Sequence, residues 1–481
     1  MAKIQQSNEY VQKNVKYVPK KIAKWEYLEE LIQSKEILNT EDLILDLSDI
    51  ISVSPNAKRI LTIPPNIQVL TLRGANGYRA SDLFKDFSVQ IASRGTPLHL
   101  ILENISFTGY QQPAIFSETP TVIELELIGN VDITGAENCP AIQVPNLQII
   151  YPSEKSIEKG KNHCIAKITG GNGSMGCEGA SGIVCEDLSI DFGASSRVYI
   201  TGGLGGSGKG YGDDGCTGGT AITSDTLCLN MKGSLYLTGG NGGTGADGED
   251  GKNGGKDGYP SSGGSSYTHS TKGENGKAGG NGGTGAEPFS VKDTVSVLKG
   301  NLFLRAGNGG DGGRGGNGQN GGNANGDSFD YGVAAWNIEK AWFDGSDGGN
   351  GGDGGNGGHT VLLNTSKIVQ ESTNCVVKVL SSTDGNGGDA GNGGRGGNGS
   401  STRATLQVWN FYGGNGGNSG KIGAGHQNGN PGLAGEVGQS GNRSGVINNG
   451  MQGTSPKKGT VVQSVRDDYN EVIVEEYTLS R

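Results

Sequence analysis

The chain has 481 residues, of which 91 are glycine and only 32% are hydrophobic. This composition excludes several conventional domains with full hydrophobic cores, because the glycine content lies far above the usual value of about 7%. The formal charge of −10 is spread along the chain without a basic stripe, which argues against nucleic-acid binding, and no apolar run is long enough to span a membrane.

Residues 1–40 are predicted to form a helical cap. Ile22, Trp25, Leu28 and Leu31 recur at three- to four-residue spacing, which is typical of a short amphipathic helix. The basic N-terminus contains no apolar stretch, so it is not a Sec-type signal peptide. Seven cysteines without C-x-x-C spacing indicate reduced thiols, in a protein made in a reducing cytosol, and not a zinc or redox site.

Residues 41–200 change to a hydrophobic period of two, as in Leu98, Leu100 and Leu102. Four segments then repeat an apolar entry, two short strands around a polar turn, and an exit similar to Thr-Gly-Gly. They begin at Ala114, Ile183, Ala221 and Phe289. Such a unit cannot close its own core, but stacked copies can. We therefore predict a mainly β fold, a right-handed parallel β-helix (solenoid), with a multi-stranded sandwich as the alternative.

The stretch RVYITGGLGGSGKGYG, at residues 197–212, resembles a phosphate-binding loop. Gly203 to Lys209 match G-x-x-x-x-G-K, but Gly210 stands where a magnesium-binding Ser or Thr belongs. The residues that follow have no helical period, which a phosphate-binding loop requires. The stretch is better interpreted as an early member of a longer glycine series.

Residues 201–445 contain that series, with glycine at every third position over long tracts such as 239–254, 273–285 and 309–321. Three residues per turn is the period of polyproline-II geometry. Glycine loses more conformational entropy on ordering than any other residue, so a single tract should be disordered. Several tracts can become ordered only if they form hydrogen bonds with one another. The pattern predicts polyglycine-II bundle insertions interleaved with the β-helix coils. A flexible linker is the alternative, but linkers have no reason to keep a triplet phase.

Aromatic residues interrupt the tracts, which come in pairs of similar length. We expect each pair to run outward and return, with a loop displayed at the tip. Aromatic side chains can stack on sugar rings or anchor protein contacts. The candidate ligand-binding residues in these tip loops are Tyr259, Tyr267, His269, Phe329, Tyr331, Trp336, Trp342 and Phe343.

Signals for catalysis or metal binding are weak. The five histidines are scattered and belong to no catalytic motif. Asp213 and Asp214 are the only tempting acidic pair, and a solvated turn explains them better. The stretch GGTGAD at residues 242–247 matches half of a calcium-binding repeat but is not repeated in tandem. We predict no catalytic residues, no cofactor and no metal.

The repeated GGNGG and GGDGGNGG tracts with interposed aromatic loops resemble the polyglycine-type tail-fibre adhesins of some bacteriophages. The resemblance covers roughly residues 170–445. It implies a sandwich of polyglycine-II helices that presents variable loops to host surface receptors. Gly-x-x antifreeze proteins share the period, but they would need a flat row of Thr or Ala where this chain has Asn, Asp and Arg.

These patterns predict a non-enzymatic recognition protein, an adhesin or receptor-binding tip for a cell-surface glycan or protein. We expect it on an extracellular or particle surface. One alternative is a self-assembling filament, coat or crystal subunit. In that case the predicted C-terminal hairpin, residues 446–481, would pair between subunits through strands 460–466 and 471–478. The other is a polysaccharide-cleaving β-helix enzyme.

Overall fold

The computed structural model describes residues 15–17, 42–47, 59–74, 86–150, 164–260, 266–293, 295–323, 346–360, 368–370, 375–396, 415–425, 427–428 and 430–436. The predicted helix around Trp25 and the predicted hairpin at residues 446–481 lie outside them. The described part of the chain is mainly β and contains no α-helix.

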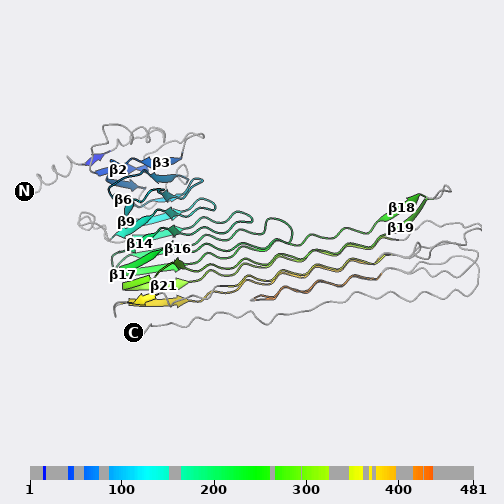
Figure 1. The fold of residues 1–481 in the computed structure, drawn as a ribbon. Coiled ribbons are helices and arrows are strands. Elements are labelled where there is room, and N and C mark those ends of the chain that lie inside the picture. Colours follow the sequence, from blue (N-terminus) through cyan, green and yellow to red (C-terminus); the bar gives the residue numbers. More distant parts are fainter. Residues whose placement is uncertain are drawn as a thin grey trace, which may run out of the picture.

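Two parallel sheets make up the end of the molecule from which the glycine tracts start (Figure 1). The larger, 14-stranded sheet contains β1 (Val15–Tyr17), β2 (Asp42–Asp46), β4 (Val69–Arg73), β6 (Leu98–Glu103), β7 (Ser106–Thr108), β9 (Val122–Thr134), β11 (Asn146–Ile150), β12 (Cys164–Thr169), β14 (Asp187–Ile190), β15 (Arg197–Thr201), β17 (Thr226–Thr238), β21 (Val295–Arg305), β22 (Ile368–Gln370) and β23 (Cys375–Leu380). The seven-stranded sheet contains β3 (Ile60–Ile63), β5 (Ser88–Ile91), β8 (Ile115–Phe116), β10 (Ile142–Gln143), β13 (Ile183–Val184), β16 (Ile222–Ser224) and β20 (Phe289–Val291).

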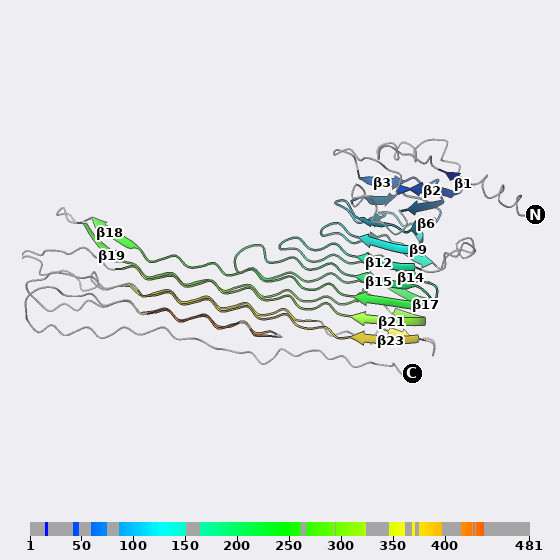
Figure 2. The same ribbon diagram turned by 180° about the vertical axis from the view of Figure 1, so that it is seen from behind.

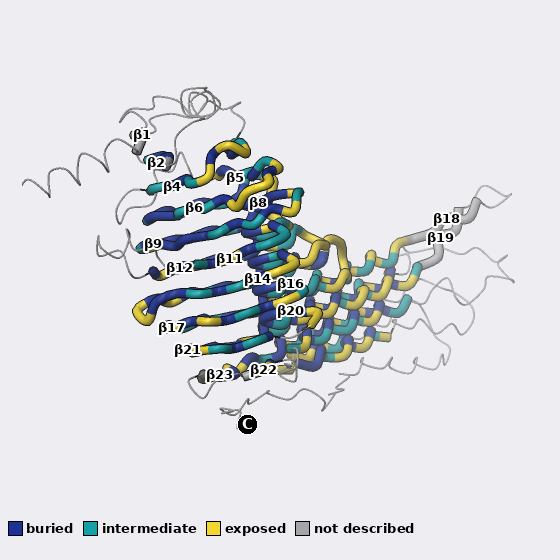
Figure 3. The backbone as a smooth tube through the Cα atoms, turned by 60° about the vertical axis from the view of Figure 1, so that its left-hand side comes forward, coloured by how far each residue is buried: buried dark blue, intermediate teal, exposed yellow. Residues whose placement is uncertain are grey.

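Alternation along the strands builds the core. In β17, Leu227, Leu229, Leu235 and Leu237 are buried, and most of the residues between them are partly or fully exposed (Figure 3). Because side chains alternate across a strand, every second residue points inward. The inward aliphatic side chains of both sheets join one hydrophobic cluster. The period of two in the sequence therefore marks the core-facing positions correctly.

The predicted right-handed β-helix solenoid is wrong, because the strand pairing closes on itself. The strands β9, β11, β14, β17, β15 and β12 form a closed ring of six parallel strands, and the second parallel sheet is separate from it. The ring depends on the two long strands, β9 and β17, of 13 residues each. The first half of each pairs with one short strand and the second half pairs with another.

A glycine lies where the two halves of β9 change partners. The first half pairs with β11 as far as Glu126, and the second half pairs with β12 from Gly129. Gly129 has φ 69°, and a Cβ there would lie 2.1 Å from Oδ1 of Asn104. Only glycine fits such a position without strain. The register also inserts Ile168 of β12 between Ile133 and Ile200.

The glycine-rich tracts extend from the sheets as a long arm (Figures 1 and 2). We call the described residues of this arm the glycine bundle: residues 170–182, 202–220, 239–255, 271–287, 307–323, 346–360, 381–396, 415–425, 427–428 and 430–436. Successive segments run away from the sheets and back again. A two-stranded antiparallel hairpin, β18 (Lys256–Pro260) and β19 (Ser266–Ser270), lies at the far end.

Candidate recognition surface

Each triplet in the glycine bundle has a first position, a second position and a spacer, as in Gly309-Gly310-Asp311. The first-position N–H donates to the spacer carbonyl of the next segment that runs in the same direction. The N–H of Gly242 donates to Asn308 O at 2.9 Å, and that of Gly312 donates to Asn386 O at 2.8 Å. These bonds join the outgoing segments into one layer, and the equivalent bonds of the returning segments form a second layer.

Second-position N–H groups bond the two layers together. The N–H of Gly310 donates to Gly283 O at 2.8 Å, and the N–H of Gly355 donates to Gly313 O at 2.8 Å. In these pairs the two segments run in opposite directions. Because each tract bonds both within its layer and across to the other, many weak contributions of about 1 kcal/mol add up against the entropy of ordering glycine.

Most first and second positions in the interior of the bundle have no room for a side chain. A Cβ on Gly242 would lie 1.9 Å from Gly283 O, and one on Gly310 would lie 2.0 Å from Gly243 O. Real carbon atoms do not approach a carbonyl so closely. Glycine is therefore required there by close backbone approach and not by an unusual φ angle.

Spacer side chains form hydrogen-bonded rows across the layers, which we call spacer ladders. In one row, the N–H of Asn308 donates to Asn241 Oδ1 at 2.9 Å, and the N–H of Thr383 donates to Asn308 Oδ1 at 3.0 Å. Another row joins Asn275, Asn350 and Asn418 in the same way. Where the preceding spacer is Asn or Asp, its side-chain oxygen thus accepts the backbone N–H that the neighbouring backbones leave without a partner.

Replacing Asn317 tests the spacer ladder. Asn317 Oδ1 accepts the N–H of Asn392 at 3.0 Å, and its own N–H donates to Asp250 Oδ1 at 2.6 Å. We expect Asn317→Ala to lower the free energy of unfolding by about 1 kcal/mol, since one hydrogen bond is lost. Asn317→Asp keeps an oxygen acceptor and should change it much less. Amide exchange at Asn392 is the direct readout, and equal protection in both variants would contradict the ladder.

The hairpin β18–β19 places part of the predicted recognition loop at the far end of the arm. Its register pairs Tyr259 with Tyr267 and Asp257 with His269. Tyr259, Tyr267 and His269, three of the predicted binding residues, therefore lie on two adjacent strands. The other predicted residues, Phe329, Tyr331, Trp336, Trp342 and Phe343, lie outside the described residues.

The acidic pair suggested by the sequence has a structural role. Asp213 Oδ2 accepts the N–H of Gly210 at 2.7 Å and closes a turn. Asp214 Oδ1 accepts the N–H of Asn281 at 2.6 Å, which is a spacer-ladder bond. The segment that matched a phosphate-binding loop is an outgoing segment of the bundle, and no helix follows it.

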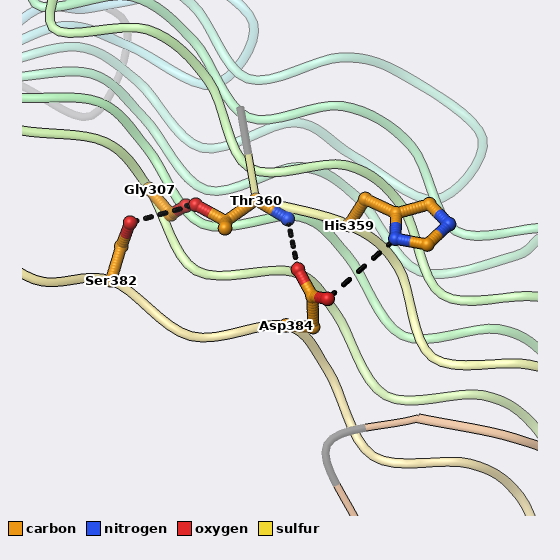
Figure 4. Close-up of polar contacts among 5 residues, drawn as sticks. All are labelled: Gly307, His359, Thr360, Ser382 and Asp384. Carbon is orange, nitrogen blue, oxygen red and sulfur yellow. Dashed lines mark hydrogen bonds and ion pairs between the residues drawn. The ribbon is translucent and has the colours of Figure 1, made fainter. Parts of the chain in front are cut away.

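A cluster of polar side chains lies where β23 enters the bundle (Figure 4). The N–H of Thr360 donates to Asp384 Oδ1 at 2.6 Å, and its hydroxyl donates to Gly307 O at 3.0 Å. The Ser382 hydroxyl lies 2.8 Å from that of Thr360, and His359 Nδ1 lies 3.6 Å from Asp384 Oδ2. Because Ser382 contacts Thr360 and not His359, the cluster lacks the serine–histidine contact of a nucleophilic site. These hydrogen bonds join the returning segment that ends at Thr360 to the outgoing segment that follows β23.

Two pairs of a basic and an acidic side chain, on neighbouring strands of the larger sheet, were not predicted. Arg73 Nε donates to Glu103 Oε2 at 3.0 Å, and His99 Nε2 lies 2.9 Å from Oε2 of the buried Glu126. Each carboxylate is next to a basic side chain, which is the usual condition for burying a charge. No sequence signal identified these pairs, because their members lie 27 to 30 residues apart.

The described residues contain no cluster of three or more His, Cys, Asp or Glu side chains that could hold a metal ion. The same residues include no helix with the length and apolar character needed to cross a membrane. Burial, with smaller contributions from nearby carboxylates, raises the pKa of Cys185 to about 12. That thiol therefore stays protonated and unreactive at neutral pH.

No family model matches the sequence, and no curated protein is similar to it. Among solved structures, the chain is similar to a springtail antifreeze protein from Granisotoma rainieri, described as a nine polyproline type II helical bundle. The identity is 20%, over 41% of this chain and 94% of that chain, with a TM-score of 0.08. A TM-score this low carries no argument about the fold or the function.

Proposed function

We propose that the protein is a non-enzymatic surface-recognition protein, an adhesin or receptor-binding tip for a cell-surface glycan or protein. The observation that carries the proposal is the arm itself. A bundle bonded in two directions ends in the hairpin β18–β19, far from the sheets (Figure 1). A rigid support of this kind limits the conformational entropy that a binding loop loses on contact, which favours affinity.

The chemistry of the loops supports the same proposal. Residues 256–270 combine two tyrosines and a histidine with serine and glycine, and residues 326–345 include two of the four tryptophans. Tyrosine and tryptophan supply a large contact area at low entropic cost, while serine and glycine adapt to a ligand. A surface ligand also places the protein on an extracellular or particle surface.

Alanine replacements in the two loops test this function. We expect Tyr259→Ala/Tyr267→Ala or Trp336→Ala/Trp342→Ala to reduce binding to a panel of cells, and a glycan array, by tenfold or more. That corresponds to the ~1.4 kcal/mol or more that truncation of an aromatic hot spot removes. Tyr211→Ala is the matched control, because Tyr211 is 71% exposed but lies in a turn of the bundle short of its far end. Undiminished binding by both double variants, with circular dichroism unchanged, would reject the tip-loop function.

A further inference from the structure

The glycine bundle has a step along one side. The segments in residues 202–220 end at a turn, where the N–H of Gly212 donates to Asp247 O at 2.9 Å. The next pair of segments, residues 239–255 and 271–287, continues beyond that turn toward the far end (Figures 1 and 2). Beyond Gly212, no described segment covers this side of the longer pair.

Where a preceding segment is present, most second positions are glycine, and in the longer pair the exceptions are the small residues Ala246 and Ala286. Their Cβ direction points at that segment: a Cβ on Gly243 would lie 2.0 Å from Gly206 O, and one on Gly283 would lie 2.0 Å from Cys216 O. The same geometry recurs in the next outgoing segment, where a Cβ on Gly313 would lie 2.1 Å from Ala246 O. In the described part of residues 307–323, Gln319 near the far end is the exception.

Beyond the step, four second positions carry long charged side chains, and we call these four residues the step edge: Glu249, Lys252, Glu274 and Lys277. The Lys277 ammonium donates to Glu249 Oε2 at 2.6 Å, and the N–H of Lys252 donates to Glu274 Oε2 at 3.2 Å. Acid and base thus alternate along and across the edge. Hydrogen bonding and charge from Lys277 lower the pKa of Glu249, so the pair is ionised at neutral pH.

The backbone at this edge keeps its capacity to bond another segment. The Asp247 carbonyl accepts an N–H from Gly212, but within the described residues no backbone N–H reaches the carbonyls of Asp250 or Asn253. On the returning segment the same holds for Asn275 and Ala278 within the described residues. Unpaired backbone groups in a row form a template for adding another chain, as at the edge of a β-sheet.

We propose that the four step-edge side chains block the addition of a second copy of this chain along the exposed side of the glycine bundle. Their Cβ atoms occupy the space that an added backbone would need, so the open carbonyls cannot be reached. The occupant that they exclude is a glycine tract of a second copy, whose first-position N–H groups would donate to the open spacer carbonyls as Gly208 and Gly212 donate to Thr244 and Asp247. Bonds of this kind join segments that run in the same direction, so the added tract would lie parallel to the segment that it bonds.

The test replaces all four side chains in the full-length protein. We expect Glu249→Gly/Lys252→Gly/Glu274→Gly/Lys277→Gly to self-associate in sedimentation velocity, and to bind a fluorescent peptide of repeated Gly-Gly-Asn triplets at least tenfold more tightly than the natural chain. The matched control is the quadruple alanine variant, which removes the same charges but keeps every Cβ. It should sediment as the natural chain does and bind the peptide as weakly.

Three outcomes would overturn the proposal. The first is a quadruple glycine variant that sediments like the natural chain and binds no peptide, while amide exchange shows Gly283 and Gly313 still protected. The second is equal association of the alanine variant, which would make charge and not Cβ the barrier. The third is equally tight peptide binding by the natural chain. None of these measurements depends on receptor binding, so the result is independent of the proposed recognition function.

Discussion

Gly310→Ala is expected to be among the most damaging single substitutions in the arm. The N–H of Gly310 donates to Gly283 O at 2.8 Å, and its carbonyl accepts the N–H of Gly358 at 2.7 Å. A methyl group there would lie 2.0 Å from Gly243 O, so this segment and residues 239–255 would have to separate. Overpacking costs about 1–3 kcal/mol, and each hydrogen bond lost adds about 1 kcal/mol. We expect a loss of about 3 kcal/mol or more, with amide protection lost along residues 307–323.

The control for this prediction is Arg314→Ala in the same segment. Arg314 is an exposed spacer, and its backbone N–H, which donates to Asp247 Oδ1 at 2.8 Å, is not removed by the substitution. An exposed substitution of this kind usually changes stability by no more than about 0.5 kcal/mol. Equal effects of both substitutions in thermal unfolding and amide exchange would contradict the close backbone contacts described for the bundle.

The sequence predicts the bonding between tracts because glycine spacing is a direct steric signal. A backbone can approach another within hydrogen-bonding distance only where side chains are missing, and a period of three keeps the bare positions in line. The observed bonds from Gly242 and Gly310 follow from that spacing. The out-and-back course was also readable, because the paired tracts have similar lengths.

The role of the spacers was not predictable from the period alone. Asn and Asp at these positions could be read as a solvated edge, and their oxygens instead accept N–H groups of the next layer member. The signal was present in the choice of residue, since Asn and Asp are the side chains that most readily bond to nearby backbone. The sequence alone does not show how spacers 67 to 75 residues apart align, because only the assembled bundle brings them side by side.

The prediction of the sheet topology was wrong for a different reason. Short strands of even spacing identify which residues face the core, and Leu235 and Leu237 do so. They do not say whether one long strand pairs with one neighbour or with two in succession. The change of partner at Gly129 in β9 closes the ring, and the sequence offers there only a single glycine between two apolar runs. Four aligned repeats also omitted β12, because residues 151–163 separate it from the preceding strand.

Leu235→Ala is expected to destabilise the sheets as strongly as Gly310→Ala destabilises the arm. Leu235 is fully buried in the second half of β17 and pairs in register with Val198 of β15 and Leu302 of β21. Truncating a buried leucine removes transfer free energy and leaves a cavity, at a cost of about 2–5 kcal/mol. Denaturant unfolding followed by circular dichroism measures the loss.

Ser234, the residue before Leu235, supplies the control for this prediction. Ser234 precedes Leu235 on the same strand but points to the partly exposed face, so Ser234→Ala should change stability by no more than about 0.5 kcal/mol. The segments of the bundle start where these strands end, as Thr238 of β17 does beside Gly239. Leu235→Ala should therefore also weaken amide protection at Gly239 and Gly242, which lie nearest the sheets. Protection unchanged at both glycines, in a variant destabilised by denaturant, would mean that the glycine bundle holds together without the sheets as its anchor.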